Sequence, residues 1–483
     1  MNVLICSFEC VPFAKVGGLA DVVGTLPKFL KSKKIDVRVV IPLHKKIDRK
    51  KFGLKNLNQR FLIPVGGIID EGNIWQGKID SVPVYFIENS KYFDRDEIYR
   101  TKDGDYSDNP LRFIFFSRSV LEFCKAIDFK PDIIHCNDMQ TGLIPAYLKT
   151  LYRIDAFFNK TKTVFTIHNI AYQGVYSKNV FYLAGFSEEE FTFEKLEYYN
   201  QINFIKAGIV YSDIVSTVSP TYAIEIQTNH EHGRGLEGVL RTRKNSLFGI
   251  LNGIDYEEWN PETDKIIKAN YNYNDISGKS LCKKDLQNLC GLPKDDVALM
   301  GMVSRLDPLK GFDLLTEISS EIVKMPVQLI ILGVGDKIYQ DILLDISRKY
   351  PEKVSLNLKF DNELAHKIYA GCDMFLMPSR SEPCGLGQMI AMRYGTVPVV
   401  HKTGGLADSV IQFNPKTKRG TGFLFEEYSS KAFLNAIKKA VESYKEKSLW
   451  ESIVLNDMKQ DFSWNNSVKE YLKIYKLAIK NNG

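Results

Sequence analysis

Residues 375–410 read FLMPSRSEPCGLGQMIAMRYGTVPVVHKTGGLADSV. The apolar run 374–378 has the length of a strand, and the polar residues 379–382 that follow it predict a loop. A helix is expected next, because apolar residues recur at helical spacing within 388–394 and Gly395 stands where a C-terminal cap belongs. This part of the stretch therefore predicts a strand, a polar loop and a helix in succession.

A second αβ unit follows within the same stretch. Residues 397–400 form another short apolar run, the pair at 404–405 supplies a glycine turn, and a helix begins at Leu406. The alternation of strands and helices predicts a parallel sheet with helices packed on it. Such sheets bind ligands at the carboxyl ends of their strands, which is where Glu382 and Cys384 fall. We expect a ligand with hydroxyl and phosphate groups at this edge.

The glycine loop has a near copy close to the start of the chain. KVGGLADVV at 15–23 and KTGGLADSV at 402–410 share Lys-x-Gly-Gly-Leu-Ala-Asp-x-Val. Each copy follows a strand candidate and opens a helix, which predicts two αβ halves facing one another with a helix N-terminus on each side of a cleft. Free N–H groups and the helix dipole at such ends suit a diphosphate. A single Gly-Gly pair is otherwise a tight turn, and Lys15 a solvated loop residue.

Length and composition indicate a globular protein of two domains. The 483 residues exceed one ordinary core, and 44% hydrophobic and 25% charged residues are typical of soluble proteins. The net charge of +6 permits an anionic ligand, whereas no basic run interleaved with stacking aromatics suggests nucleic acid. The chain opens directly into the strand candidate 2–8, and no run reaches the roughly 18 apolar residues of a membrane helix. We expect a cytoplasmic protein without membrane contact.

The cysteines and histidines do not indicate a metal or redox centre. None of the eight cysteines forms a Cys-x-x-Cys pair, and Cys6, Cys124 and Cys372 lie in apolar segments that predict burial. Cys384 would lend its backbone N–H and compact side chain to sugar binding, because no base adjoins it to activate the thiol. The run 230–232, His-Glu-His, has no third ligand nearby and is interpreted as a solvated loop.

Five motifs, spread in order over nearly the whole chain, carry a resemblance to a known family. They are KVGGLAD at 15–21, FTIHN at 165–169, LNGID at 251–255, SRLDPLKG at 304–311 and PSRSEPCGL at 378–386. With them the sequence resembles the bacterial glycogen synthase and plant starch synthase family, which transfers glucose from a nucleotide sugar. The resemblance implies the α/β fold called GT-B, with two Rossmann-like domains whose parallel sheets face each other across a cleft.

The resemblance also suggests a division of the chain. An N-terminal, glucan acceptor-side domain would span 1–246 and be joined by 461–483, because the family's final helix crosses back to the first domain. A nucleotide-sugar donor domain would span 247–460, and Phe248 would open its first strand. Two connections between the domains would restrict their motion to hinge closure.

The same resemblance assigns roles to individual side chains. The catalytic residues would be Arg305 and Lys310 against the departing diphosphate, Glu382 orienting the donor hydroxyls, and His168 bonding the glucose primary hydroxyl. A lone histidine after a strand is otherwise structural. The expected substrate-binding residues are Lys15, Gly17, Gly18, Asp21, Asp138, Asn252, Phe360, Cys384, Gly385, Leu386, Thr403, Gly404 and Gly405.

Aromatic side chains offer further contacts. Phe360 stands where the family commonly has an aromatic against the nucleotide base, although a buried core phenylalanine is the alternative. The polar segment 92–110 is loop-like, and its Tyr99 and Tyr106 are either platforms for sugar rings or ordinary surface tyrosines.

Two positions depart from the family pattern. Asn137-Asp138-Met139 replaces the usual His-Asp-Trp, so Asp138 keeps a carboxylate for an acceptor hydroxyl while the aromatic contact is lost. Many retaining GT-B enzymes carry Glu-x7-Glu, but the second position is Ile390 here. The reaction expected from the resemblance moves glucose from ADP-glucose to the non-reducing end of an α-1,4-glucan such as glycogen, with retention. The leaving phosphate acts as base, and no metal or cofactor is expected.

Two other functions stay open at this point. Another GT-B enzyme, such as a sucrose or trehalose-phosphate synthase, would not extend malto-oligosaccharides. A non-catalytic glucan- or nucleotide-binding relative would be expected to lose its charges first, yet Lys15, Arg305, Lys310 and Glu382 are all present. Preference for ADP over UDP rests on resemblance to the bacterial and plant branch alone.

Overall fold

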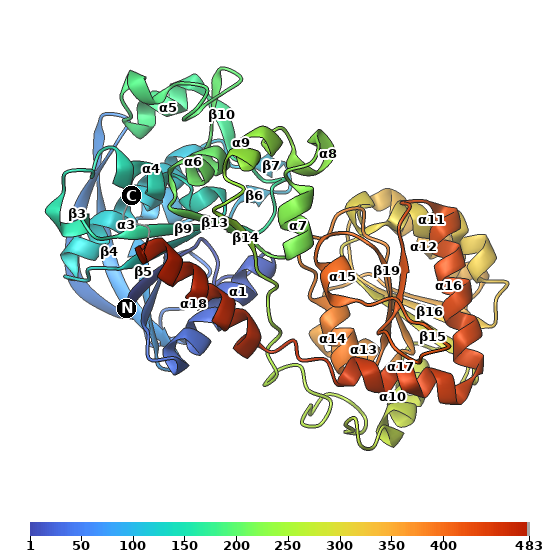
Figure 1. Ribbon diagram of the computed structural model, residues 1–483. Helices are drawn as coiled ribbons and strands as arrows, with labels where there is room; N and C mark the ends of the chain where they lie inside the picture. The colour runs from blue at the N-terminus through green and yellow to red at the C-terminus, as the bar shows by residue number, and fades with distance from the viewer. Residues whose placement is uncertain (481–483) are drawn as a thin grey trace. The chain divides into compact units, whose positions relative to one another are not determined.

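The computed structural model describes residues 1–480, so the last three residues of the predicted segment 461–483 lie outside the described residues. The chain forms two compact units. The first contains residues 1–218, 223–250 and the C-terminal stretch from Ser467, and the second contains residues 219–222 and 251–466. Each unit is a sheet covered by helices (Figure 1).

The first unit is built on a nine-stranded sheet in the order β14-β13-β9-β8-β1-β2-β5-β4-β3. All neighbours are parallel except in the β5-β4-β3 meander at one edge. The strands are β1 Asn2–Cys6, β2 Asp36–Pro42, β3 Lys55–Val65, β4 Ile68–Ile79, β5 Val82–Glu88, β8 Ile133–Asn137, β9 Lys162–Ile167, β13 Ile214–Thr217 and β14 Leu247–Gly249.

Helices and two small sheets complete the first unit. The small sheets are β6 Arg100–Thr101 with β7 Gly104–Asp105, and β10 Val175–Ser177 with β12 Gln201–Asn203 and β11 Glu197–Tyr198. The helices in this part of the chain are α1 Gly18–Ser32, α2 Ser90–Phe93, α3 Asn109–Ala126, α4 Leu143–Lys149, α5 Lys178–Ala184, α6 Phe204–Tyr211, α7 Pro220–Glu225, α8 His230–Gly233, α9 Glu237–Thr242 and, at the C-terminus, α18 Trp464–Lys480. Short 3-10 turns lie at Met139–Thr141, Ala156–Phe158 and Glu188–Glu190.

The second unit has a six-stranded, fully parallel sheet in the order β17-β16-β15-β18-β19-β20. Its strands are β15 Ala298–Val303, β16 Val327–Leu332, β17 Val354–Asn357, β18 Met374–Met377, β19 Val397–His401 and β20 Phe423–Phe425. Its helices are α10 Ser277–Leu289, α11 Phe312–Ile322, α12 Lys337–Lys349, α13 Asn362–Gly371, α14 Gly387–Arg393, α15 Gly404–Ser409, α16 Ser430–Lys445 and α17 Lys447–Met458, with a 3-10 turn at Pro308–Lys310.

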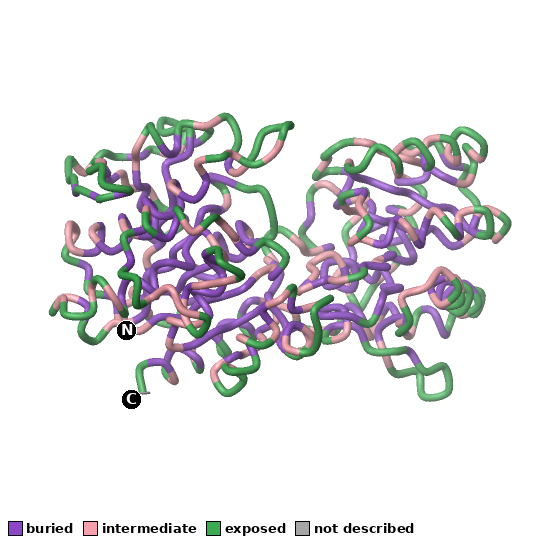
Figure 2. The backbone as a smooth tube through the Cα atoms, turned by 90° about the horizontal axis from the view of Figure 1, so that it is seen from above, coloured by how far each residue is buried: buried purple, intermediate pink, exposed green. Residues whose placement is uncertain are grey.

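Both sheets form because their central strands are continuous apolar runs. β16, with the sequence VQLIIL, is buried at every residue, as expected for a parallel strand covered by helices on both faces. In each unit the buried backbone, drawn in purple, lies in the interior, and the exposed segments, drawn in green, lie on the outside (Figure 2).

The C-terminal helix α18 belongs to the first unit, although the second unit precedes it in the sequence. Figure 1 shows it in red against the blue and green elements of that unit. The buried His135 of β8 bonds the Tyr475 hydroxyl through Nδ1 at 2.8 Å and Thr166 Oγ1 through Nε2 at 2.6 Å. The apolar face of α18, with Val468, Tyr471 and Tyr475 each fully buried, therefore completes this core.

Four segments differ from the sequence-based expectations. The strand at 247–249 pairs with β13 and so completes the first sheet, although we expected it to open the second domain. The segment 92–110 carries parts of α2 and α3 and the β6–β7 hairpin instead of a continuous loop. Residues 230–232 lie in helix α8, because Asn229 accepts the His232 N–H and caps a helical turn there. The β3–β4 hairpin was not predicted.

The described part of the chain contains neither a membrane-spanning helix nor a metal-binding cluster of side chains. None of its helices combines the length and apolar character needed to cross a bilayer. In the same residues, no three His, Cys, Asp or Glu side chains gather in a way that could hold a metal ion.

Candidate active site

The order of the second sheet defines a switch point between β15 and β18. With β15 taken as the first strand, the sheet runs 3-2-1-4-5-6, and its connections reverse direction between the first and the fourth strand. Doubly wound sheets bind ligands at this point, outside the carboxyl ends of the two strands. The loop after β15 carries Arg305 and Lys310, and the loop after β18 carries Glu382. The predicted catalytic residues of this unit therefore converge at the switch point.

An ion pair joins Lys310 to Glu382. Lys310 Nζ lies 2.6 Å from Glu382 Oε2, and the Ser379 hydroxyl donates to the same oxygen at 3.0 Å. The Glu382 side chain is 9% exposed and that of Lys310 24%. A carboxylate this deeply buried requires a partner, because an unpaired charge in a poorly hydrated site is costly. Two side chains 72 residues apart thus form one charged centre.

This centre borders a cavity of about 140 Å³. Small-molecule sites usually measure roughly 300–1,000 Å³, so the cavity accommodates one group of a larger ligand, such as a phosphate or a sugar. Gly385 has a φ of +69°, a value that glycine adopts without strain. The cavity is lined by Met302, Val303, Ser304, Lys310, Tyr369, Leu376, Met377, Ser379, Glu382, Gly385, Leu386 and Gly387.

The second glycine loop packs directly against the Glu382 loop. The Gly405 N–H donates to the Glu382 carbonyl at 3.0 Å. A Cβ on Gly404 would lie 2.1 Å from that carbonyl oxygen, and one on Gly405 would lie 1.9 Å from the Cys384 carbonyl oxygen. The glycines therefore permit a close backbone approach that no other residue allows. Our expectation of a free N–H for a diphosphate does not hold at Gly405, because the protein itself accepts it.

Cys384 and Asn252 form a buried contact behind this loop. Burial raises the pKa of the Cys384 thiol to about 12, and Asn252 hydrogen-bonds it. The thiol is therefore neutral near pH 7 and is not an activated nucleophile. Asn252 Oδ1 is buried and, within residues 1–480, has no hydrogen-bond partner.

Arg305 and Phe360 lie at the surface of the second unit. The Arg305 side chain is 58% exposed and lies 3.7 Å from Asp307, a distance typical of a weak surface ion pair. Phe360 is 85% exposed, between β17 and α13. The alternative of a core phenylalanine is thus excluded, and its ring is accessible to a ligand.

The first sheet has a corresponding switch point between β1 and β8. The loop after β1 is held by Glu9, which is 4% exposed. Glu9 Oε2 accepts the N–H groups of Val16 at 2.5 Å and Gly17 at 2.9 Å, and Oε1 accepts the Tyr99 hydroxyl at 2.7 Å. The Gly17 N–H is therefore also taken by the protein rather than free for a phosphate.

Lys15 and the first helix lie next to this carboxylate. Lys15 Nζ pairs with Asp21 Oδ1 at 2.7 Å, and both side chains are partly exposed. Helix α1 begins at Gly18 with Gly17 as its N-cap. A Cβ added at Gly17 or Gly18 would meet nothing within 4 Å, unlike the close packing at Gly404 and Gly405. The two copies of the motif thus differ in their physical role.

Asp138 and His168 form a hydrogen-bonded group at the ends of β8 and β9. Asp138 Oδ1 accepts the His168 N–H at 2.7 Å, and His168 Nε2 lies 2.9 Å from Asn137 Oδ1. Since the Asn137 amide nitrogen donates to the Cys6 carbonyl, its oxygen is the acceptor and His168 Nε2 carries the proton. Burial lowers the pKa of His168 to about 3, so the ring is neutral near pH 7.

Asp138 has an unusual backbone and an unusual pKa. Its φ of +56° and ψ of −176° are almost restricted to glycine, and such strain often accompanies function. Burial raises the pKa of its carboxyl to about 7 despite the N–H groups of His168 and Asn169. Met139, where a tryptophan is usual, packs with its sulfur against Gly174 and offers no ring.

The tyrosines of segment 92–110 are held within the protein. The Tyr99 ring stacks on Phe8 at a centroid distance of 6.0 Å, so one face is already covered. The Tyr106 ring lies 5.3 Å from the buried Arg112 guanidinium. Their role as sugar platforms stays a prediction. Sequence reasoning missed Glu9, Asn137 and Ser379; the signal for Glu9 was a carboxylate directly after an apolar strand.

Comparisons with known proteins agree with this architecture. Residues 2–242 match the family model of the starch synthase catalytic domain, and residues 291–452 match that of glycosyl transferases group 1. The glycogen synthase of Geotalea daltonii is 47% identical over 484 residues, with 100% of both chains covered. That of Thermotoga petrophila is 48% identical, with 99% of both chains covered.

Solved structures give the same result. The catalytic domain of starch synthase IV from Arabidopsis thaliana, bound to ADP and acarbose, superposes with a TM-score of 0.91 at 35% identity and 99% coverage of both chains. The sucrose-phosphate synthase of Thermosynechococcus elongatus has a TM-score of 0.61 at 17% identity, over 99% of this chain and 98% of that one, and shows the fold alone.

Two Rossmann-like units with charged residues at their switch points define a glycosyltransferase of the GT-B class. Within that class, the sequence identity of 47–48% to glycogen synthases over 99–100% of the chain determines the family. The chain belongs to the family of bacterial glycogen synthases and plant starch synthases.

Proposed function

We propose that this protein is a glycogen synthase that transfers glucose from ADP-glucose to the non-reducing end of an α-1,4-glucan, with retention at the anomeric carbon. The observation that carries the proposal is identity of 47–48% to glycogen synthases along the whole chain, together with the charged centre at the second switch point. ADP as the nucleotide is supported by the starch synthase structure that holds ADP.

The proposal assigns roles to residues of each unit. The second unit binds the nucleotide sugar, with the diphosphate near Arg305 and Lys310 and the base on the exposed ring of Phe360. Lys15, beside the first glycine pair and Asp21, contacts the phosphates of the donor, and Asp138 bonds an acceptor hydroxyl. Glucan binding is supported by the acarbose held in the related starch synthase.

Cleavage of the glycosyl–phosphate bond increases the negative charge on the departing ADP. Arg305 and Lys310 stabilise that charge, and preorganised donors of this kind contribute most where charge develops. Lys310 therefore has two roles: its ammonium group is ion-paired with Glu382, and it also stabilises the departing diphosphate. Glu382 in turn orients the donor hydroxyls.

Transfer occurs on one face of the sugar. The acceptor hydroxyl oxygen bonds to the anomeric carbon as the carbon–phosphate oxygen bond breaks, and the hydroxyl proton passes to the departing phosphate oxygen. No protein nucleophile is needed, which agrees with Ile390 at the position of a second glutamate. The neutral His168 has Nδ1 available for a sugar hydroxyl, because that nitrogen makes no hydrogen bond within the described residues.

The decisive assay supplies glycogen with radiolabelled ADP-glucose or UDP-glucose in parallel. We expect label in glycogen from ADP-glucose and much less from UDP-glucose. A screen with malto-oligosaccharides, sucrose precursors and sugar phosphates tests the acceptor. Extension of a sugar phosphate but not of malto-oligosaccharides would contradict the proposal and indicate another GT-B activity.

A further inference from the structure

A second cavity, of about 990 Å³, lies in the second unit away from the candidate active site. Its lining includes Val297 and Ala298 at the start of β15, Pro326 just before β16, and Asp373 just before β18. These residues mark the amino ends of parallel strands, whereas Lys310 and Glu382 follow their carboxyl ends. The cavity therefore opens at the opposite edge of the sheet, and the proposed reaction does not use it.

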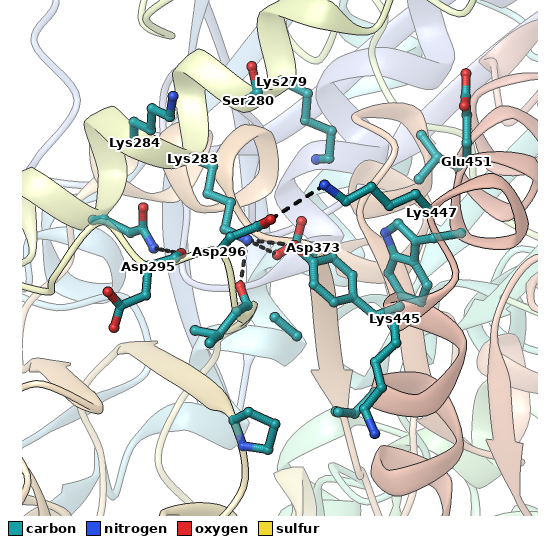
Figure 3. A pocket seen from close by; sticks show the side chains of 18 of the residues that line it. Lys279, Ser280, Lys283, Lys284, Asp295, Asp296, Asp373, Lys445, Lys447 and Glu451 are labelled. Atoms are coloured by element: carbon teal, nitrogen blue, oxygen red, sulfur yellow. Dashed lines mark hydrogen bonds and ion pairs between the residues drawn. The ribbon is translucent and has the colours of Figure 1, made fainter.

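Helices from two parts of the chain form its walls. Helix α10 supplies Lys279, Lys283 and Lys284, and the junction of α16 with α17 supplies Tyr444 and Lys445 on one side and Lys447 and Trp450 on the other. Figure 3 shows the lysines of both walls, with Asp296 between Lys283 and Lys447 and Asp295 to one side. All these residues belong to the second unit.

The inner polar groups of the cavity are already satisfied. Lys283 pairs with Asp373 at 2.7 Å and also donates to the Val297 carbonyl and the Tyr444 hydroxyl. Lys279 donates to the carbonyls of Ala370 and Tyr394 and to the Thr396 hydroxyl. These contacts hold Lys279 and Lys283 in place, so the exposed lysines around the opening determine which ligand is attracted.

The lining of the cavity carries a small excess of positive charge. Six lysines and four carboxylates line the cavity, and Lys283 neutralises Asp373. Lys447 lies 3.5 Å from Asp296 and Lys445 lies 2.8 Å from Glu442, and all four side chains are 58–88% exposed, so both are weak surface pairs. Lys284 and Lys294 are exposed. Several flexible ammonium groups around one opening suit a dianion, because lysine binds phosphate as a point charge.

The floor between the lysines is largely apolar. Ile276, Val297, Pro326, Val441, Trp450 and Val454 line it, and the Trp450 ring meets Tyr444 edge-on at a centroid distance of 5.3 Å. A volume near the upper end of the usual range for small-molecule sites, with an apolar floor and a few charged groups, is typical of a binding pocket for an organic ligand. A bare inorganic ion would leave this floor unused.

We propose that this cavity binds a small organic phosphate, with the phosphate among Lys284, Lys294, Lys445 and Lys447 and the organic body against Trp450 and Val454. The site is independent of the sugar-transfer reaction, so its failure would leave the proposed function untouched.

The test uses the intact protein at constant ionic strength and the fluorescence of Trp450. Inorganic phosphate, ribose 5-phosphate and adenosine monophosphate are titrated, and Trp450→Phe identifies the signal from this site. We expect adenosine monophosphate to bind most tightly and inorganic phosphate least, because only the former covers the apolar floor. Equal affinity for the three probes, or a signal of unchanged size in Trp450→Phe, would overturn the proposal.

Variants that remove a positive or a negative charge from the lining should change the affinity for the probes in opposite directions. Lys284→Ala and Lys294→Ala should each weaken binding roughly two- to fivefold, the range expected for exposed charges. Asp296→Asn should strengthen it, since it removes a competing carboxylate and frees Lys447. Lys439→Ala, on the exposed side of α16 outside the cavity, is the matched control and should have no effect. Binding that is lost in Lys310→Ala but retained in Lys284→Ala would place the probe at the candidate active site and refute the inference.

Discussion

Replacing Lys310 by alanine should affect both the stability of the second unit and the rate of glucose transfer. The variant leaves Glu382, which is 9% exposed, without its cation at 2.6 Å. Breaking a fully buried ion pair costs about 3–5 kcal/mol. Lys310 is 24% exposed and the Ser379 hydroxyl remains as a donor, so we expect a smaller loss, on the order of 2 kcal/mol.

Arg305→Ala is the matched comparison on the same loop. Arg305 is 58% exposed and its ion pair is long, so its loss should cost under about 1 kcal/mol. A domain of this size changes its Tm by roughly 2–4 °C per kcal/mol. Lys310→Ala should therefore lower Tm by about 4–8 °C and Arg305→Ala by no more than about 4 °C.

The kinetic effects should be similar in the two variants. If both groups stabilise the departing diphosphate, each substitution should lower kcat by roughly 10²–10³-fold, with less effect on donor KM. The double variant should lose less than the product of the two, because both act on one leaving group. Calorimetry and initial rates at saturating glycogen measure these quantities.

Glu382→Gln provides the internal control for the stability argument. In the Lys310→Ala background it removes the unpaired charge and should recover most of the lost Tm without restoring turnover. The reasoning is refuted if Lys310→Ala retains wild-type Tm, if Glu382→Gln gives no recovery, or if the losses of rate in Arg305→Ala and Lys310→Ala multiply strictly.

Phe360→Ala should leave Tm nearly unchanged, since the ring is 85% exposed. It should raise the KM for ADP-glucose roughly tenfold, because stacking on the base is lost. An unchanged KM for ADP-glucose would show that the ring does not contact the nucleotide. Gly405→Ala should abolish most activity or lower Tm by several degrees, because its Cβ would lie 1.9 Å from a backbone oxygen. Gly17→Ala should change rate and Tm little, because its Cβ would meet no atom within 4 Å. Equal effects of the two variants on rate and Tm would contradict the packing argument. The pKa of Asp138, raised by burial to about 7 from an ordinary 3.8, means that the folded protein holds this proton more tightly than the unfolded chain, so its contribution to stability falls as pH rises from about 4 to 7. Asp138→Asn should therefore gain Tm relative to wild type at pH 8 but little at pH 4, and parallel Tm curves against pH would show that the carboxyl does not titrate in this window.

Sequence patterns predicted the second sheet well. Its strands are short, continuous apolar runs bounded by polar or glycine-containing loops, which is the pattern of buried parallel strands. The run 374–378 is β18 to within one residue, and 397–400 lies inside β19. The β3–β4 hairpin was missed, although Phe61, Ile63 and Val65 alternate with exposed residues before a Gly-Gly turn. This alternation and the glycine turn are local features of the sequence, so the hairpin could have been predicted from them.

The electrostatics of the site could not be read from sequence. Nothing local indicates that Lys310 pairs with Glu382, because the contact depends on the order of β15 and β18 in the sheet. The two glycine loops look alike in sequence, yet Gly405 packs on a backbone from the preceding loop and Gly17 donates to the carboxylate of Glu9. The same sequence motif therefore has a different structural role in each unit, because the fold places different neighbours beside it.

The position of α18 has a consequence for synthesis on the ribosome. Tyr475 and Tyr471 fill the core beside His135, which leaves the ribosome about 340 residues earlier. The first unit to be translated is thus the last to be completed, and the second unit has all its residues available beforehand. Until translation ends, the apolar side chains that pack against α18 and the Nδ1 atom of His135 lack their partners. Nascent chains stalled before residue 464 should therefore bind chaperones through the N-terminal half, and release of the complete chain should end that binding.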